Sequence, residues 1–366
     1  MSKAVAISRN DRPSVDVTIG EHAEQLSSQL QAMSEALFPP TSQKSLRKFT
    51  SGEAARLMKI SDSTLRKMTL AGEGPQPELA SNGRRFYTLK QINEIRGMLA
   101  GSARGRESVE FVPHRRGAEH LQVIAVTNFK GGSGKTTTSA HLAQYLALHG
   151  YRVLAVDLDP QANLSYSLGL EDQAGTMADV FSGTKSLREI LTSRNGLTVA
   201  PGSNELVDIE ISLVTQPQRE SFLKNILAAA KGYDYILVDC PPSLSLLTVN
   251  ALAASDEVLI PLQMEVLTLQ GLGQILATVA QIRSTFNARL KVKGIVVVMF
   301  DKRRKLSSEI QDYLQQNIDE KIFTARIRLN VKLAEAPSFG KSVLDYDSSS
   351  NGARDYMALA EEFLKK

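Results

Sequence analysis

Eight residues, Lys130 to Thr137 (KGGSGKTT), constrain the fold of this chain more than any other segment. They follow an apolar run, residues 123–126, and precede a stretch, residues 139–149, that we expect to be helical. A strand that turns through small residues into a helix N-terminus directs backbone N–H groups and the positive end of the helix dipole toward one point. Glycine has no Cβ, so an anion can approach the backbone closely. The segment therefore predicts a phosphate-binding loop between a strand and a helix.

Within this loop, each residue type suits a nucleoside triphosphate. Lys135 is expected to reach the β- and γ-phosphates, and the Thr136 hydroxyl to bind Mg²⁺. A glycine-rich turn without a ligand is the alternative, and it is disfavoured because the strand, the helix and the Gly-Lys-Thr triplet occur together. The predicted nucleotide-binding residues of the loop are Lys130, Gly131, Gly132, Ser133, Gly134, Lys135, Thr136 and Thr137.

Two later apolar runs also end in carboxylates. Residues 152–156 precede Asp157 and Asp159, and residues 235–238 precede Asp239. In an open parallel sheet, ligands lie beyond the carboxyl ends of the strands, so we expect these acids to face the phosphates. Asp239 suits Mg²⁺ coordination. Strand and helix patterns continue to alternate toward the C-terminus, which predicts an α/β fold with a doubly wound, mostly parallel sheet.

Length and composition narrow the class of protein. A chain of 366 residues predicts two or three domains, and no apolar run has the roughly 18 residues of a membrane span. The first residues lack an uninterrupted apolar segment, so we expect no secretory signal and a cytoplasmic location. The single cysteine, Cys240, excludes an internal disulfide framework and a four-thiolate cluster within one chain. We interpret Cys240 as a core residue, with a redox role as the alternative.

Positive charge is concentrated before the loop. Residues 44–116 carry 15 Lys and Arg against 7 Asp and Glu, whereas the rest of the chain carries 28 against 32. Such a basic segment indicates an anionic partner, nucleic acid first. Residues 103–119 are rich in Gly, Ser and Arg without a regular period, and we interpret them as a linker before a nucleotide-binding P-loop domain at residues 120–366.

Residues 41–102 predict a winged helix-turn-helix DNA-binding domain. Helices at 53–59 and 64–70 are joined by a short turn, and residues 82–88 resemble a hairpin wing before a helix at 89–99. The pattern resembles the MerR type. A packing domain of the same geometry without DNA is the alternative. The candidate DNA contacts are Ser63, Thr64, Arg66, Lys67, Thr69, Arg84 and Arg85.

Residues 1–40 are expected to contain an α-helix with one apolar stripe. Leu26, Leu30, Met33 and Leu37 are spaced by four, three and four residues, and two prolines follow. A lone amphipathic helix must bury its stripe, so dimerisation and packing on its own domain are both open.

The loop departs from the usual template in one place. Phe129 stands where a glycine is usual, and an additional lysine, Lys130, opens the loop. With the later strings DLDPQ and VDCPPS, this departure resembles the ParA/MinD-type ATPases with a deviant Walker A loop, over residues 120–362. The resemblance implies a homodimer that shares ATP and Mg²⁺, with Lys130 touching the partner's nucleotide. It also implies that Lys130 and Lys135 act in catalysis, that Asp159 positions the attacking water and that Asp157 supports the magnesium.

A late segment, residues 333–341 (LAEAPSFGK), resembles the family's loop on the adenine side, so the resemblance places Pro337 and Phe339 against the nucleotide. The N-terminal extension resembles that of the RepA/ParA proteins of plasmid replication–partition operons. That likeness implies a weak intrinsic ATPase stimulated by a ParB-type centromere-binding partner, nucleoid association and autorepression of its own operon.

Dimerisation would also gather basic residues into a non-specific DNA surface, although such a run is often only a solvated loop. The candidates are Lys302, Arg303 and Arg304, with Lys305, Arg326 and Arg328 nearby. One rival function is a MinD-like membrane-associated positioning ATPase. The last 14 residues lack the basic face expected for lipid, so we expect no membrane partner. The other rival is a transcriptional regulator that uses the P-loop body only for dimerisation.

Overall fold

The computed structural model describes residues 25–26, 28–29, 46–103, 111–112, 120–170, 173–194, 196–301, 303 and 305–365. The chain divides into two compact units, Met1–Gln43 and Lys44–Lys366. In the first unit, residues 25–26 and 28–29 are helical and exposed. Leu26 belongs to this helix, and the other members of the predicted stripe, Leu30, Met33 and Leu37, lie outside the described residues.

Residues 49–102 of the second unit form a small module of strands and helices. β1 (Phe49–Thr50) and β2 (Glu78–Leu79) both pair antiparallel with β3 (Arg85–Tyr87). The helices of the module are α2 (Ser51–Leu57), α3 (Asp62–Leu70) and α4 (Leu89–Ser102). The hairpin of β2 and β3 spans the segment expected as a wing, and the pairing of β1 with β3 adds a strand that the sequence did not indicate.

Hydroxyl side chains set the starts of these three helices. Thr50 accepts from the Glu53 amide, Ser61 from the Thr64 amide and Thr88 from the Gln91 amide. Each such bond satisfies an N–H group that has no partner inside the helix. The polar caps fix where the helices begin, and the apolar residues between them form the core of the module.

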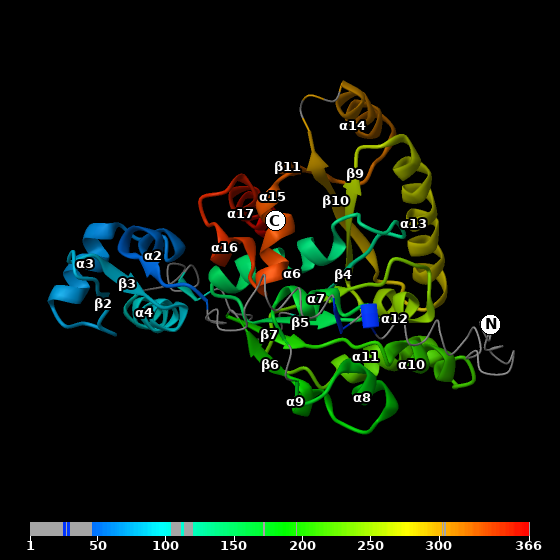
Figure 1. Ribbon diagram of the computed structural model, residues 1–366, viewed down its shortest axis with the longest axis horizontal. Helices are drawn as coiled ribbons and strands as arrows, with labels where there is room; N and C mark the ends of the chain where they lie inside the picture. The colour runs from blue at the N-terminus through cyan, green and yellow to red at the C-terminus, as the bar shows by residue number, and fades with distance from the viewer. Residues whose placement is uncertain are drawn as a thin grey trace, which may run out of the picture. The chain divides into compact units, whose positions relative to one another are not determined.

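In the described part of the second unit, eight strands form the main sheet (Figure 1). Every neighbouring pair is parallel except β6 and β7. In spatial order the strands are β11 (Ile322–Arg328), β10 (Lys291–Phe300), β9 (Glu257–Gln263), β4 (Gln122–Val126), β8 (Tyr235–Asp239), β5 (Val153–Asp157), β7 (Leu197–Ala200) and β6 (Thr192–Arg194). The predicted α/β class with a mostly parallel sheet is confirmed.

Helices cover both faces of this sheet, as side chains of β4 show. Val123 and Ala125 belong to the apolar core on one face, and Ile124 and Val126 to the core on the other. The first face packs against α8 (Met177–Ser182), α9 (Leu187–Ile190), α10 (Leu206–Leu213), α11 (Phe222–Leu227), α12 (Leu246–Ala254), α13 (Val266–Thr285) and α14 (Lys305–Asn317). The second packs against α6 (Lys135–Leu148), α7 (Asn163–Ser167), α15 (Val331–Glu335), α16 (Val343–Tyr346) and α17 (Asn351–Leu364). The short helix η1 (Arg219–Ser221) contacts α12, and η2 (Ala336–Phe339) contacts α7 and α15.

The helix after the phosphate loop begins earlier than the sequence indicated. α6 starts at Lys135, four residues before the expected start at residue 139. Three consecutive threonines have low helix propensity, which hid this first turn from sequence reasoning. Burial of nearly the whole of α6 overrides that preference. Lys135 and Thr136 therefore lie in the first helical turn, beside the positive end of the helix dipole.

The C-terminal helix α17 is part of the core. Leu359 and Phe363 are buried, and α17 packs on β11 and α6. These two side chains face the core, whereas Met357 of α17 is exposed. Among the described residues, no helix combines the length and the apolar character that crossing a bilayer requires. Cys240 is also buried, directly after β8, as expected of a core residue.

Candidate nucleotide-binding site

The loop between β4 and α6 forms a cradle, residues 127–137. Gly132 and Gly134 adopt φ of 69° and 79°, the left-handed region that suits glycine. The Asn128 side chain accepts a hydrogen bond from the Lys130 amide at 2.9 Å and donates to the Pro261 carbonyl at 2.7 Å. Asn128, which sequence reasoning did not single out, thus fixes the cradle to β9.

The residues of the cradle fit a triphosphate. No atom lies within 4 Å of the position where a Cβ on Gly131 or Gly132 would stand, so the backbone is open to a ligand there. Among the described residues, the hydroxyl oxygen of Ser133 is buried without a hydrogen-bond partner. The first N–H groups of α6 have no acceptor inside the helix. An anion with several oxygens would satisfy these donors.

Lys135 supplies positive charge inside the cradle. Its Nζ lies 3.3 Å from the carbonyl oxygen of Lys130, so the side chain folds back over the loop. Burial lowers the pKa of Lys135, and the carboxylates of Asp239 and Asp159 oppose that shift. The predicted phosphate-binding lysine and two of the predicted acids are therefore close enough to interact.

Asp239 stands at the centre of the acidic side of the site. Its two oxygens accept from the hydroxyls of Thr136 at 2.7 Å and Ser139 at 2.9 Å. In the register of β5 and β8, Asp239 is the direct partner of Asp157. Burial raises the pKa of Asp239, and the charge of Asp157 raises it further. A divalent cation would relieve this cost, and carboxylate and hydroxyl oxygens are the ligands that Mg²⁺ prefers. Ser139 was missed, although its spacing of three from Thr136 places both on one helix face.

Asp157 and Asp159 have different surroundings. The Asp157 carboxylate accepts from the Ser165 amide at 2.9 Å, the Ser165 hydroxyl at 2.7 Å and the Asp159 amide at 3.2 Å. Burial raises the pKa of Asp157. These bonds make Asp157 a support for the turn that carries Asp159, and a direct contact of Asp157 with magnesium stays a prediction. The Asp159 carboxylate accepts from the Gln161 amide at 3.0 Å.

Lys130, the additional lysine, is held within its own chain. Its Nζ lies 2.8 Å from Glu265 Oε2 and 3.3 Å from Gln263 Oε1. The Gln263 amide also donates to the Gly132 carbonyl at 3.0 Å. Sequence reasoning missed Gln263 and Glu265, because nothing in their local pattern marks them as neighbours of the cradle. The reach of Lys130 to a partner's nucleotide stays a prediction.

The late loop predicted to line the base lies in η2 and the turn after it. Phe339 stacks on Tyr346 of α16, with 4.9 Å between the ring centroids. Pro337 is half-buried in η2. A Cβ on Gly340 would lie 2.8 Å from the Gly169 Cα, so the loop after η2 packs closely on the segment after α7. Contact of Pro337 and Phe339 with a nucleotide stays a prediction.

Most of the predicted DNA contacts of the small module lie on its exposed surface, but some of their hydroxyls bond to other side chains of the module. Ser63, Thr64, Arg66 and Lys67 of α3 are all exposed. The hydroxyls of Ser63 and Thr64 lie 2.8 Å and 2.7 Å from Ser61 Oγ, so they belong to the helix cap. In contrast to these residues, Thr69 is half-buried, and its hydroxyl bonds to Tyr87 Oη at 2.8 Å.

The hairpin of β2 and β3 carries two arginines. Arg84 is exposed, and its amide donates to Asn82 Oδ1 at 3.1 Å in the turn. Arg85 is half-buried at the start of β3, opposite Leu79. The turn between the strands contains Gly83 with φ of 76°. This geometry presents Arg84 more fully to a ligand than Arg85.

The second predicted DNA surface is described only in part. Lys302 and Arg304 lie outside the described residues. The exposed guanidinium of Arg303 donates to both oxygens of Asp301, at 3.0 and 2.9 Å. Arg328 forms a bidentate ion pair with Asp355 of α17, at 2.5 Å for the shortest contact. Arg328 therefore has a structural partner that the sequence did not reveal.

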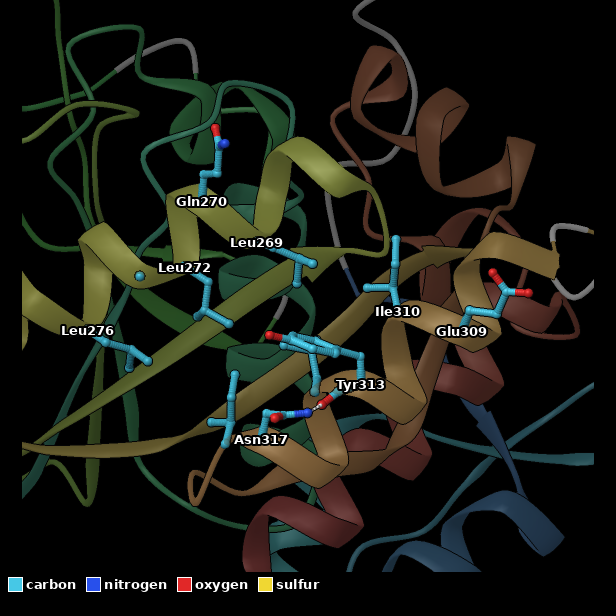
Figure 2. A pocket seen from close by; sticks show the side chains of 11 residues that line it. Leu269, Gln270, Leu272, Leu276, Glu309, Ile310, Tyr313 and Asn317 are labelled. Carbon is cyan, nitrogen blue, oxygen red and sulfur yellow. Dashed lines mark hydrogen bonds between the residues drawn. The ribbon is translucent and has the colours of Figure 1, made fainter.

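A separate apolar groove of about 640 Å³ lies between α13 and α14 (Figure 2). Its lining includes Leu269, Leu272, Ile310 and Tyr313, and Glu309 is its charged member. A groove of this composition does not suit a triphosphate, because it offers no cation. The cradle remains the candidate site.

Comparison with known proteins agrees with this geometry. A family model described as an AAA domain matches residues 121–292. The chromosome partitioning protein ParA of Caulobacter vibrioides is 40% identical over 256 residues, covering 68% of this chain and 96% of that protein. The chain belongs to the ParA family of partition ATPases.

Two further similarities concern this ParA-family chain. The sporulation initiation inhibitor protein Soj of Bacillus subtilis is 43% identical over 246 residues, covering 66% of this chain and 97% of Soj. A cobyrinic acid a,c-diamide synthase from Mycobacterium smegmatis, crystallised with ADP and magnesium, is similar in structure with a TM-score of 0.59. It is 32% identical and covers 66% of this chain and 93% of its own. The small module at residues 49–102 lies outside the family-model match.

Proposed function

We propose that this ParA-family chain hydrolyses ATP to ADP and phosphate and uses the cycle to segregate plasmid or other replicon DNA. The observation that carries the proposal is the convergence on Asp239. Thr136 and Ser139 donate to this carboxylate, and Lys135 lies within electrostatic reach of it. Phosphoryl transfer requires a cation, a set of metal ligands and a phosphate cradle. The candidate site combines these parts at the ends of parallel strands.

The residues of the cradle receive distinct roles. The backbone of residues 131–137 and the ammonium of Lys135 would hold the phosphates of ATP. Mg²⁺ would be held by Thr136 and Asp239 and would neutralise part of the phosphate charge. Asp159 would orient the attacking water, and Asp157 would keep the turn carrying Asp159 in place through Ser165. Water exclusion by the buried strand ends would strengthen these electrostatic interactions.

A second copy of the chain would complete the site. Lys130 would leave Glu265 and touch the phosphates bound by the partner subunit, so that ATP is shared in a sandwich dimer. The family resemblance carries this step, and the exposed position of Lys130 agrees with it, since its side chain is 41% exposed. Intrinsic hydrolysis would be weak, and a ParB-type centromere-binding partner would stimulate it.

The small module supplies the second activity. We propose that it is a winged helix-turn-helix that binds an operator and represses its own operon, with α3 in the major groove and Arg84 and Arg85 at the wing. In the ATP form, Arg303 and its basic neighbours would add a non-specific DNA surface. Such binding would associate the protein with the nucleoid in the cytoplasm.

ATP turnover tests the proposal. It should be measured alone, with non-specific DNA, with the centromere-binding protein and with both together. A rise with both additions that exceeds the sum of the separate effects supports DNA segregation. Turnover that is unchanged by DNA and by the centromere-binding protein would contradict the proposal. The non-specific DNA affinity of the ATP form should also fall steeply with salt, because phosphate contacts release counterions.

A further inference from the structure

The short helix α16 (Val343–Tyr346) is linked to the phosphate cradle through one side chain of α6. The amide of Val343 donates to His141 Nε2 at 2.9 Å, and His141 Nδ1 lies 2.7 Å from the carbonyl oxygen of Thr137. Burial lowers the pKa of His141 to about 4, so the ring is neutral at pH 7. Because Nε2 accepts, Nδ1 carries the proton and donates to Thr137. A single side chain thus joins the end of the cradle to the start of α16.

The same helix contacts the loop expected beside the base. Tyr346 stacks on Phe339 at 4.9 Å, and its hydroxyl donates to Glu335 at 2.8 Å. α16 is therefore linked to both segments that we expect to move or become ordered when a nucleotide binds. One of them is the candidate phosphate cradle, and the other is the loop expected to face the base.

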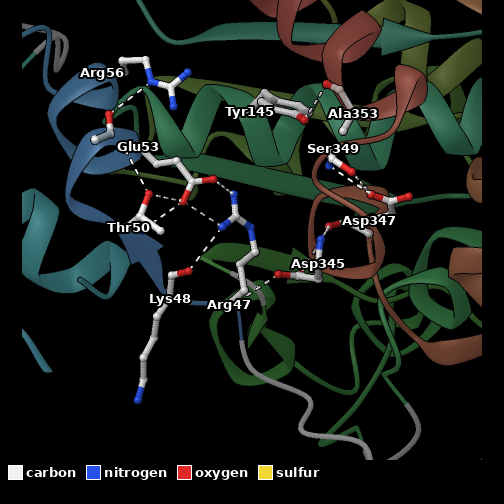
Figure 3. A network of polar contacts seen from close by, with 12 residues as sticks. Arg47, Lys48, Thr50, Glu53, Arg56, Tyr145, Asp345, Asp347, Ser349 and Ala353 are labelled. Atoms are coloured by element: carbon white, nitrogen blue, oxygen red, sulfur yellow. Dashed lines mark hydrogen bonds and ion pairs between the residues drawn. The ribbon is translucent and has the colours of Figure 1, made fainter. Parts of the chain in front are cut away.

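Between these two contacts, α16 also holds the small module. Asp345 accepts a hydrogen bond from the backbone amide of Arg47 at 2.9 Å (Figure 3). The Arg47 guanidinium pairs with Glu53 at 2.7 Å in the first turn of α2. Glu53 in turn closes the capping box with Thr50. A continuous chain of polar contacts therefore runs from the cradle to the helix that precedes α3.

The module has a second attachment, which is of a different kind. Arg96 of α4 is 2% exposed, and its guanidinium donates to the carbonyls of Leu57 and Leu148, both at 2.6 Å. Leu57 ends α2 and Leu148 ends α6, so one cation interacts with two helix C-termini. This contact is made at the C-terminal end of α6, away from the phosphate loop, so we expect it to act as a fixed anchor. The contact at Asp345 is the one that a change near the nucleotide can reach.

We propose that α16 couples the nucleotide site to the DNA-facing module, with Asp345 as the positioning residue. Nucleotide in the cradle orders η2 and α16, and Asp345 then holds residues 46–57 more firmly against the body. The coupling is reciprocal, so DNA bound to the module also favours the nucleotide-bound form. This inference rests on the proposed function, because it needs a nucleotide in the cradle.

Hydrogen exchange of the full chain, with and without Mg·ADP, tests the coupling. In the unmodified protein, Mg·ADP should slow exchange in two separate places, the cradle at 128–140 and the segment at 46–57. We expect exchange at 46–57 to slow by about fivefold, which corresponds to the lower end of typical coupling free energies. The Asp345→Ala variant should lose the slowing at 46–57 and keep it at 128–140.

Two further variants separate coupling from loss of structure. Asp345→Asn keeps an oxygen that can accept from Arg47, so it should retain the slowing at 46–57. Asp347→Ala is the matched control, because Asp347 lies two residues further on and its carboxylate accepts from the amide and the hydroxyl of Ser349 in the following turn (Figure 3). It should behave as the unmodified protein. Slowing at 46–57 that persists in Asp345→Ala, or that is absent in the unmodified protein while 128–140 is slowed, overturns the coupling. Absence of slowing at 128–140 contradicts the proposed function instead.

Discussion

The ammonium of Lys130 lies 2.8 Å from the Glu265 carboxylate of the same chain. Glu265 is also the N-cap residue of α13, where its side chain accepts from the third amide of the helix. The family resemblance assigns Lys130 to the nucleotide of a partner subunit, but within the single chain Lys130 forms an ion pair with Glu265. Dimerisation on ATP would have to break this pair.

Glu265→Gln should therefore favour the dimer. The pair is half-exposed, so it is worth less than about 1 kcal/mol, and we expect the dimer dissociation constant to fall by about twofold to fivefold. Sedimentation with a non-hydrolysable ATP analogue measures this. Lys130→Gln is the control, because it removes both the pair and the expected contact, and it should weaken the dimer. A Glu265→Gln protein that dimerises less well would show that the cap, and not the ion pair, is the important contact.

Binding and hydrolysis should separate at Lys135 and Asp159. Lys135→Ala removes the cation from the cradle, so nucleotide affinity should be lost. Asp159→Ala leaves the cradle intact, so affinity should remain while turnover falls by about 100-fold or more. Calorimetric titration with ATP and a phosphate-release assay measure the two properties. Equal loss of affinity in both variants would argue that Asp159 binds nucleotide and does not orient water.

His141 should make stability depend on pH. Its pKa falls from 6.5 to about 4 in the fold, so the unfolded chain binds more protons than the folded chain between these values. The free energy of unfolding should therefore decrease by up to about 3 kcal/mol as pH falls from 6.5 to 4. Denaturant titrations at several pH values test this. His141→Gln should have lower stability at pH 7 but a shallower decrease, and an unchanged slope would mean that other groups, such as the half-buried His149, cause the effect.

The wing should carry DNA affinity without ATP turnover. Arg84→Ala combined with Arg85→Ala should reduce operator affinity by about tenfold or more and leave turnover unchanged. Footprinting on the promoter region of the protein's own gene measures the first property. Lys90→Ala is a suitable comparison, because Lys90 is exposed and basic in the same module but lies on α4. Loss of turnover together with DNA binding would indicate a structural role for the wing.

Sequence reasoning was strongest where a backbone conformation or a strand end dictates residue type. The cradle required small residues at Gly132 and Gly134, and both adopt positive φ. Asp157 and Asp239 were expected at strand ends, and the register of β5 and β8 places them side by side. The two helices expected at 53–59 and 64–70 are present, and each begins two residues earlier than expected, at Ser51 and Asp62. These features depend on short segments, so they can be recognised from the sequence alone.

The sequence was weaker for contacts between distant segments. The ion pair of Arg328, which was placed behind a candidate DNA surface, with Asp355 of α17 was not foreseen, and the start of α6 was placed four residues late. The contacts of Ser165 with Asp157 and of Glu265 with Lys130 were also missed, because no sequence pattern around Ser165 or Glu265 indicates them. Such partners depend on which strands and loops pack together. The residue types next to a side chain in the sequence do not indicate which distant segment it will contact.

By itself, the sequence determined that the chain folds around a phosphate cradle in a parallel sheet, because glycine placement, strand-end acids and apolar periodicity are properties of short segments. Only the tertiary structure decided that Lys130 rests on Glu265, that Arg96 joins the ends of two helices and that Asp345 holds Arg47. These pairs lie 39 to 298 residues apart along the chain. Their formation depends on the packing of the whole unit, which brings buried polar groups together so that each finds a partner.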